Sequence, residues 1–292
     1  MKRDRLKPYV YKVKGAKNYA LYDLFHGKIF QIIPEGEPHE LREELLKENL
    51  IFETEGVVPY KLSMDLSKEF TELRIKELQL RLDGVYEDTC WSRNVVKKTG
   101  KRMDEKIVSI LLEQVSGLEI NRVRIETAEY DDSIKSIIER IVSSLQSRKI
   151  EIYSAHEFGK EEISSLTGLI ANSNKQLEIK KREQVDLSEF DISMYRFFYS
   201  RDFNPCLGHK AAVDTNGDIK PCLWLNEIIG NIRENNIKDL ITSGRFAPYW
   251  ELSKNDIGEC KACEMRYACN DCRVCSGQGD FSKEKRALFC KV

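Results

Sequence analysis

Eight of the nine cysteines of this 292-residue chain lie in its last third. Cys260 with Cys263, Cys269 with Cys272, and Cys272 with Cys275 form Cys-x2-Cys pairs. Two thiolates at this spacing can face one soft metal centre from a single tight turn. The other three cysteines of the region are Cys206, Cys222 and Cys290. We therefore expect this part of the chain to bind metal.

A hairpin is predicted directly before Cys222. Residues 214–222 read Asp-Thr-Asn-Gly-Asp-Ile-Lys-Pro-Cys, a pattern typical of a strand, an Asn-Gly turn and a second strand. The second strand ends at the cysteine, so the hairpin would hold this thiolate rigidly. This strengthens the prediction of a metal site.

The kind of metal is less constrained by spacing. Thiolate-only sites suit zinc and iron–sulfur clusters about equally. Five residues separate Cys263 from Cys269, which is short for a zinc ribbon, and eight cysteines exceed one tetrahedral site. A disulfide framework fits poorly, because no segment resembles a secretion signal and the cysteines cluster in one third of the chain. Iron–sulfur ranks ahead of zinc, and disulfides rank last.

The same stretch resembles the SPASM domain, which closes many radical-SAM peptide maturases and carries two auxiliary [4Fe–4S] clusters. As in that family, a glycine (Gly217) stands five positions before Cys222, and the later cysteines follow the family order. The matching cysteines are Cys206, Cys222, Cys260, Cys263, Cys269, Cys272 and Cys290. One departure is that two residues, not three, separate Cys269 from Cys272. The resemblance covers residues 200–292.

The resemblance implies two interleaved ligand sets. One cluster would take Cys260, Cys263, Cys269 and Cys290, and the other would take Cys206, Cys222 and Cys272. Fully ligated members have a further cysteine just before the first, and residues 199–205 contain none. The second cluster would then be completed by Cys275 or keep an open iron for a substrate thiolate or carboxylate. An ordinary free thiol is an equal alternative for Cys275.

Two histidines are weaker candidates. His209 could ligate an open iron, because imidazole replaces thiolate in some clusters, although a histidine on a surface turn is the favoured interpretation. His156 follows a predicted strand, where sites occur in parallel sheets. We expect Trp224 and Trp250 to shield the clusters.

Residues 1–60 predict a small winged-helix-like domain. Strands are expected at 9–14, 19–24 and 28–33, and a helix at 39–49. This order resembles the leader-peptide-recognition domains of peptide maturases, in which a strand edge captures the leader. A simple cap on the next domain is an equal alternative.

Residues 61–200 alternate strand and helix. Strands are expected at 74–82, 123–125, 149–153 and 177–180, and helices at 104–118, 134–145 and 161–171. This order predicts a parallel sheet with right-handed crossovers, and hence an α/β fold. We interpret the region as a degenerate partial (β/α) barrel of the radical-SAM kind, followed by the SPASM-like domain at 201–292.

The catalytic cluster of radical-SAM enzymes needs Cys-x3-Cys-x2-Cys after the first barrel strand. Only Cys90 stands at that place, as a remnant or a small buried residue, so no S-adenosylmethionine cluster is expected. The whole chain resembles the SPASM-only proteins of grasp-with-spasm peptide systems. The resemblance implies a ribosomally made precursor peptide and an ATP-grasp ligase as partners, and no phosphate-binding glycine loop occurs here.

Composition excludes several other classes. The net charge of −1 gives no general attraction to nucleic acid or to an anionic membrane, and no apolar run approaches the length of a spanning helix. We expect a cytoplasmic protein. Whether it modifies the peptide itself, or is a non-catalytic adaptor or scaffold with structural clusters or zinc, is left open by the sequence.

Overall fold

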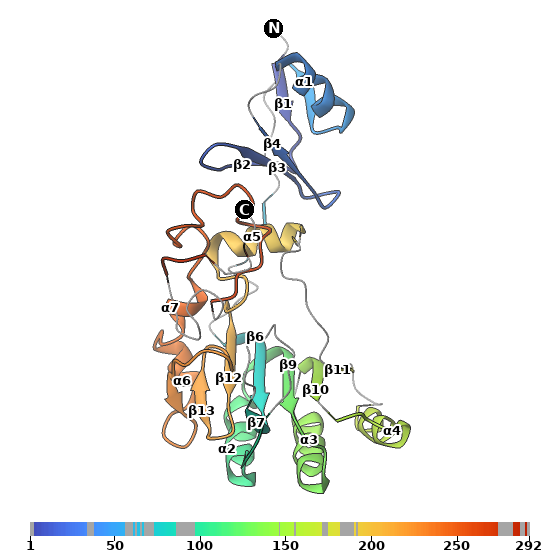
Figure 1. Cartoon of the computed structure of the whole chain (residues 1–292), viewed down its shortest axis with the longest axis vertical. Helices are drawn as coiled ribbons and strands as arrows, with labels where there is room; N and C mark the ends of the chain where they lie inside the picture. The colour runs from blue at the N-terminus through green and yellow to red at the C-terminus, as the bar shows by residue number, and fades with distance from the viewer. Residues whose placement is uncertain are drawn as a thin grey trace.

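The computed structural model describes residues 3–33, 38–55, 61, 63, 64, 66, 73–85, 97–145, 147–154, 156–170, 175–181, 190, 192–273, 283–286 and 290. It is elongated, with the N-terminal strands at one end and a large sheet with its helices at the other (Figure 1). Cys90 and Cys275 lie outside the described residues. Among those described, no helix is long and apolar enough to cross a membrane.

The N-terminal part contains the three predicted strands and the predicted helix. They are β2 (Val10–Lys14), β3 (Tyr19–Asp23), β4 (Lys28–Ile32) and α1 (Pro38–Lys47). The strands form an antiparallel sheet in the order β2-β3-β4. A second ribbon, which the sequence analysis did not predict, pairs β1 (Arg3–Leu6) with β5 (Ile51–Thr54). Leu21 and Leu50 are buried between these elements.

The predicted strands and helices of the middle region are confirmed. They are β6 (Arg74–Arg81), α2 (Glu105–Val115), β9 (Glu119–Thr127), α3 (Asp132–Ser144), β10 (Ser147–Ser154), α4 (Lys160–Gly168) and β11 (Gln176–Lys181). The strand predicted at 123–125 is longer, and a short ribbon of β7 (Asp83–Val85) and β8 (Lys97–Arg102) was not predicted. Asp104 and Asp131 cap α2 and α3, each accepting a hydrogen bond from a backbone amide in the first turn.

The C-terminal part adds short elements. They are α5 (Met194–Asp202), β12 (Lys210–Val213), β13 (Asp218–Lys220), β14 (Gly230–Asn231), α6 (Ile237–Thr242) and α7 (Ala247–Trp250). The central sheet has seven strands in the order β11-β10-β9-β6-β12-β13-β14. Its first five strands are parallel, and β13 and β14 run antiparallel to their neighbours. The fold is therefore mixed α/β, and β12 joins the cysteine-rich third to the main sheet.

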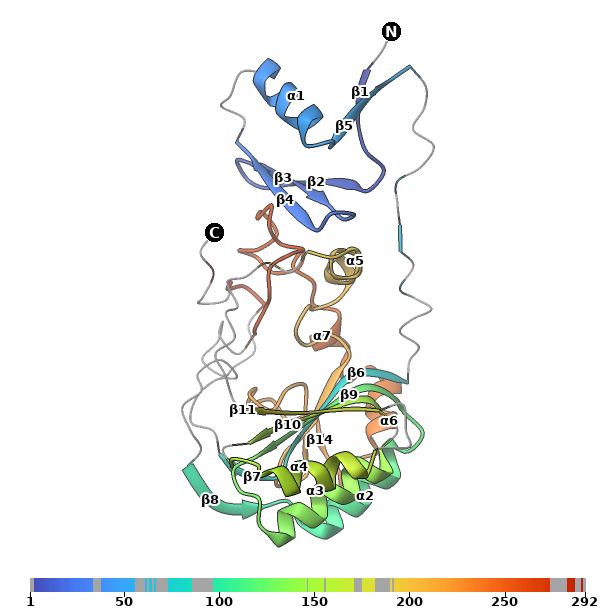
Figure 2. The same ribbon diagram turned by 90° about the vertical axis from the view of Figure 1, so that its right-hand side faces the viewer.

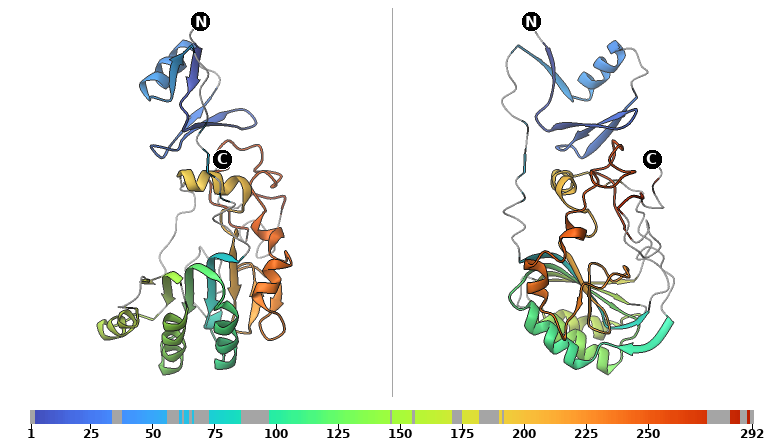
Figure 3. Two further views of the ribbon diagram at one scale, coloured as in Figure 1. Left: turned by 180° about the vertical axis from the view of Figure 1, so that it is seen from behind. Right: turned by 90° about the vertical axis from the view of Figure 1, so that its left-hand side faces the viewer.

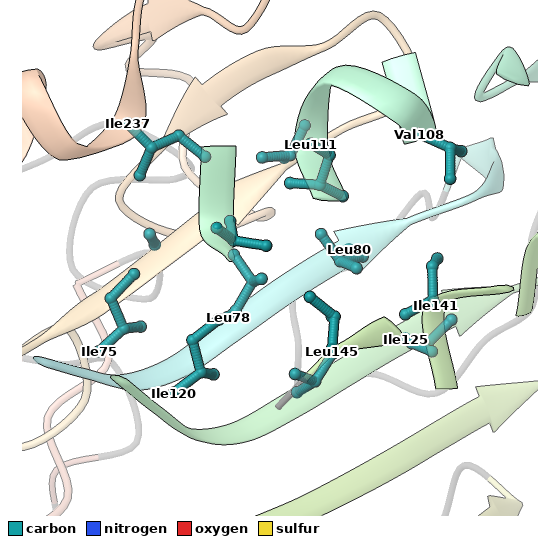
Figure 4. Packing of buried hydrophobic residues seen from close by; sticks show 14 of the residues in the cluster. Ile75, Leu78, Leu80, Val108, Leu111, Ile120, Ile125, Ile141, Leu145 and Ile237 are labelled. Carbon is teal, nitrogen blue, oxygen red and sulfur yellow. The ribbon is translucent and has the colours of Figure 1, made fainter. Parts of the chain in front are cut away.

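Helices α2 and α3 cover one face of this sheet, as Figure 2 and the left view of Figure 3 show. Leu78 and Leu80 of β6 point toward Leu111 of α2, and Leu145 after α3 packs beside them (Figure 4). These four side chains are at most 2% exposed. Burying such a leucine stabilises the fold by about 1.5–3 kcal/mol. The apolar stripes thus form the core, and the opposite face of the sheet faces the cysteine-rich third.

Candidate iron–sulfur centres and the adjoining cavity

The predicted hairpin before Cys222 is present. It joins β12 to β13 through a turn in which Gly217 has a φ of +82°, a conformation that favours glycine. A Cβ atom at this position would also lie 2.9 Å from Cγ2 of Ile232. The Asp214 carboxylate accepts hydrogen bonds from the amides of Asn216 and Asp218. Local turn chemistry thus fixes the strand that leads to Cys222.

Asn204 positions Cys206. Its Oδ1 atom accepts hydrogen bonds from the amides of Cys206, at 3.0 Å, and Leu207, at 2.8 Å. Its Nδ2 atom donates to Asp271 Oδ2 at 2.9 Å. Asn204 is fully buried, so it connects the turn at Cys206 to the residue that precedes Cys272. This side chain thus links two parts of the chain that are 67 positions apart.

Cys206, Cys222 and Cys272 lie together, and we call them the three-thiol group. A hydrogen bond to Cys272, together with burial, raises the pKa of the Cys206 thiol well above its ordinary value. Burial raises the pKa of Cys222 to about 12, although the Lys210 ammonium opposes this. Nζ of Lys210 lies 3.6 Å from Sγ of Cys206 and 3.5 Å from a carboxylate oxygen of Glu77. A lysine ammonium therefore faces the half-buried thiol of Cys206 and acts on the buried thiol of Cys222.

A second set surrounds Lys254 and is called the four-thiol group: Cys260, Cys263, Cys269 and Cys290. The negative charge of a Cys290 thiolate contributes to raising the pKa of each of the other three thiols, which places Cys290 near them. Nζ of Lys254 lies 3.8 Å from Sγ of Cys260 and 3.7 Å from Sγ of Cys269. Burial raises the pKa of Cys269 to about 11 and also raises the pKa values of Cys260 and Cys263.

The charge of Lys254 is held in place by buried partners. Its ammonium pairs with Asp271 at 3.3 Å, and Asp271 also pairs with Arg273. Burial would lower the pKa of Lys254, but Asp271 and the two neighbouring thiols outweigh it and raise the pKa instead. Thiolates on a metal would strengthen the same attraction. Each thiol group is thus provided with a cation that offsets the negative charge of thiolate ligands.

The donor chemistry of both groups fits iron–sulfur clusters. Such clusters are held by cysteine thiolates, four for a fully ligated [4Fe–4S] cluster. All seven described cysteines are free thiols. Within the described residues, no three His, Cys, Asp or Glu side chains converge closely enough to hold a single metal ion. The groups have the same members as the two ligand sets implied by the sequence, and their role as ligands stays a prediction.

A cavity of about 270 Å³ adjoins the three-thiol group. Cys206, Cys222 and Trp224 line it on one side, and Glu77 of β6 and Arg122 of β9 line it on the other. These two charged residues form an ion pair across neighbouring parallel strands. The cavity therefore lies between the thiols and the face of the sheet that α2 and α3 leave uncovered, which we call the inner face.

The inner face is unusually charged for a parallel sheet, whose two faces are normally apolar. Arg81 and Arg124 both pair with Glu126, which is fully buried. Burial would raise the pKa of Glu77, but Lys210, Arg122 and Arg124 outweigh it and hold the pKa far below its usual value. Glu77 is therefore ionised at neutral pH.

The sequence analysis missed these residues. The available signal was the alternation of charged with apolar residues within β6 and β9, in Glu-Leu-Gln-Leu-Arg and Arg-Val-Arg-Ile-Glu. A strand buried on both faces would have read as a continuous apolar run. The alternation therefore indicates one polar face, which the fold places opposite the helices.

The family model described as an iron–sulfur cluster-binding domain, SPASM, matches residues 206–275. This stretch is a SPASM domain. It begins at the first cysteine of the three-thiol group and includes three members of the four-thiol group. No curated protein matches the chain in sequence.

Several solved structures are similar to the chain. The crystal structure of BtrN in an open conformation has 16% identity and a TM-score of 0.41, over 69% of this chain and 94% of BtrN. SuiB of Streptococcus suis bound to its precursor peptide SuiA has 10% identity and a TM-score of 0.29, over 99% and 100%. Native anSMEcpe with bound AdoMet and Cp18Cys peptide has 11% identity and a TM-score of 0.39, over 74% of this chain and 94% of anSMEcpe.

His209 is buried at the start of the SPASM domain, which corrects the interpretation as a surface-turn histidine. It is 6% exposed, and its Nδ1 atom lies 3.2 Å from the hydroxyl of Tyr199. Phe203 and Trp250 pack against its ring. Burial lowers the pKa of His209 to about 4, so the imidazole is neutral at pH 7. The sequence could not show this, because the aromatic neighbours come from separate elements.

The remaining candidates occupy different surroundings. His156 stacks on Tyr130 and lies 3.2 Å from a carboxylate oxygen of Glu162. Trp224 lies over Arg81, with the guanidinium carbon 4.7 Å from the ring centroid, and it lines the cavity. Trp250 donates a hydrogen bond to the carbonyl of Lys210.

The N-terminal sheet docks on the SPASM domain beside the four-thiol group. The hydroxyl of Tyr22 donates to the backbone carbonyl of Glu264, and Gln31 donates to the Glu264 carboxylate at 2.6 Å. The amide of Ala16 donates to the carbonyl of Ala262 at 2.8 Å. Because Ala262 lies between Cys260 and Cys263, the N-terminal domain contacts the very turn that carries two thiols.

Proposed function

We propose that this chain is a SPASM iron–sulfur protein of ribosomal peptide maturation that carries two [4Fe–4S] clusters. The observation that carries the proposal is the pair of separate thiol groups, each facing its own buried lysine, within and beside the segment that matches SPASM. The four-thiol group of Cys260, Cys263, Cys269 and Cys290 would ligate one cluster completely.

The three-thiol group of Cys206, Cys222 and Cys272 would hold the second cluster. Cys275 or a substrate group would complete its ligation. The position of the cavity supports the second arrangement, because Cys206 and Cys222 form part of its wall. A cluster bound there would supply redox chemistry or Lewis acidity. The residues of the inner face would hold and orient the bound group.

The proposed substrate is a precursor peptide captured by the N-terminal domain. In the described part of the chain, β2 and β4 each pair with β3 alone, so both have an edge that could add an extended peptide. This domain docks against the turn of Cys260 and Cys263. A captured leader would therefore be held next to the clusters.

The proposal includes two further parts that rest on the sequence resemblance. No S-adenosylmethionine cluster is expected, because Cys90 alone stands where three cysteines are needed. An ATP-grasp ligase would supply the ATP chemistry, with this protein presenting or modifying the shared peptide in the cytoplasm.

Metal and sulfide analysis after anaerobic purification tests the proposal. We expect about eight irons and eight sulfides per chain, with a broad absorption band near about 400 nm. The Cys260→Ala variant should lose about four irons, and so should Cys222→Ala, because the two groups are separate. One or two zinc ions without sulfide would contradict the clusters and favour a peptide-binding scaffold. Co-purification of the precursor peptide with the chain, abolished by deleting residues 1–60, tests the peptide partner.

A further inference from the structure

The cavity beside the three-thiol group is lined by more positive than negative side chains. The cations are Lys76, Arg122, Arg124, Arg196 and Lys210, and the carboxylates are Glu77 and Asp271. With Cys206 and Cys222 counted as neutral thiols, five cations against two carboxylates leave a formal excess of three positive charges in the lining. One of these cations, Lys210, also faces Cys206.

Partners outside the lining reduce this excess only in part. Arg124 pairs with Glu126 and Arg122 with Glu151, and both carboxylates offset positive charge on the β9 side. Asp271, in contrast, is already neutralised by Lys254 and Arg273, neither of which lines the cavity. The positive charge is therefore concentrated on the opposite side, toward α5 and β12.

Lys76 lies where this charge is concentrated. Its Nζ atom lies 4.3 Å from the ring centroid of Tyr199, and Arg196 and Lys210 line the same cavity. Burial and then Arg196 lower the pKa of Lys76 to about 8, with further lowering by Lys210, and Glu77 only partly opposes them. An ammonium destabilised in this way gains when an anion enters the cavity.

Arg122 contributes a guanidinium group to the lining of the cavity. It pairs with Glu77, which also lines the cavity, and lies 4.0 Å from Glu151. Guanidinium groups match the planar geometry of a carboxylate.

We propose that this cavity binds a carboxylate group of a peptide and holds it beside Cys206 and Cys222. The proposal builds on the function above, since it names the chemical class that the proposed peptide would present to the three-thiol group. The volume of about 270 Å³ is slightly below the usual range for small-molecule pockets of about 300–1,000 Å³. The site therefore suits one side chain or one chain terminus, rather than a longer segment.

Calorimetric titration of the anaerobically purified full chain tests this site. N-acetylglutamate α-amide presents a side-chain carboxylate, and N-acetylalanine presents a terminal one. N-acetylglutamine amide is the neutral isostere of the first probe. We expect at least one acid to bind about tenfold more tightly than the neutral probe, and the stronger acid identifies the source of the carboxylate. Equal binding of all three probes would overturn the proposal.

Variants of Lys76 test whether the charge of this lysine is required for binding. Lys76→Gln should weaken binding of the acid about tenfold, and Lys76→Arg should retain it, because the charge is retained. Lys149→Gln is the matched control, since Lys149 pairs with Glu151 and Glu178 on the same sheet without lining the cavity. Thermal unfolding of each variant reports whether it is folded. The comparison of the three probes uses the unmodified chain, so it tests the proposal even if a variant does not fold.

Iron and sulfide analysis of the same samples separates the two proposals. Full cluster content without preferential binding of the acids would overturn the carboxylate site and leave the proposed function intact. Zinc without sulfide, with acid binding that depends on Lys76, would overturn the clusters and support the carboxylate site.

Discussion

The hydroxyl of Tyr22 donates a hydrogen bond of 2.8 Å to the backbone carbonyl of Glu264, across 242 positions of the chain. Tyr22 is only 1% exposed, and Glu264 directly follows Cys263 of the four-thiol group. The middle strand of the N-terminal sheet is thus bonded to the loop that carries a predicted cluster ligand. A substitution in the N-terminal sheet at Tyr22 should therefore affect the loop of Cys263, and a change in that loop should affect the docking of the sheet.

Replacing Tyr22 with phenylalanine removes only this hydroxyl. The carbonyl of Glu264 loses its buried donor, so we expect a loss of about 1–3 kcal/mol in the free energy of unfolding. Denaturant titration under anaerobic conditions measures the loss. Tyr19→Phe on the same strand is the control, because the cation–π contact of Lys12 with its ring is retained. Equal stabilities of the two variants would contradict the assigned role of the Tyr22 hydroxyl.

Gly208 allows little room for a side chain. A Cβ atom there would lie 2.2 Å from the hydroxyl of Tyr199 and 2.6 Å from the backbone carbonyl of Asn204. Gly208→Ala should therefore displace the turn that carries Cys206 and cost about 1–3 kcal/mol of stability. Iron content should fall as well, because this thiol would move. Gly117→Ala is the control, since a Cβ atom at that position would have no neighbour within 4 Å among the described residues, and it should keep both stability and iron.

Lys254 should tune the redox potential of a cluster on the four-thiol group. Replacing this 2%-exposed lysine with methionine removes a positive charge that stabilises the reduced state. We expect the midpoint potential of this cluster to fall by about 50–150 mV. A redox titration followed by electron paramagnetic resonance measures it. Lys261→Met, at an exposed position in the same loop, should leave the potential unchanged. A full iron content with an unaltered potential in the Lys254 variant would refute this role.

Carboxylate binding in the cavity should weaken as pH rises through about 8. Only the protonated form of Lys76 attracts the ligand, and its pKa in the free protein is about 8. A bound carboxylate raises that pKa, so binding near pH 8 should take up protons. The groups that face Lys76 are Glu77 on its own strand, Arg122 on β9, Lys210 on β12, Arg196 and Tyr199 on α5, and His209 directly before β12.

Titrations at pH 7, 8 and 9 in buffers of different ionisation enthalpy measure this effect. We expect the affinity for the acid probe to be highest at pH 7 and to decrease toward pH 9. Lys76→Arg should bind with little pH dependence over this range, because arginine stays protonated. A steep decrease that persists in the arginine variant would assign the titration to another group.

The sequence by itself determined the local structure. The apolar stripe that includes Ile107 and Leu111 predicted α2, and the Asn-Gly pair ending at Gly217 predicted the turn before Cys222. These features depend on side-chain periodicity and turn conformation within a few residues. The spacing of the cysteines likewise indicated metal binding, because it too is a local property of the chain.

Only the tertiary structure decided which side chains surround the thiols. Lys210 and Lys254 belong to no recognisable sequence motif, yet each faces one thiol group. The cavity joins Lys76 to Asp271, almost 200 positions apart, and the SPASM hairpin reaches it because β12 pairs with β6. Such contacts depend on how separate elements pack. Local sequence propensity does not predict these contacts, because the free energy that stabilises them comes from burial and charge pairing between distant segments.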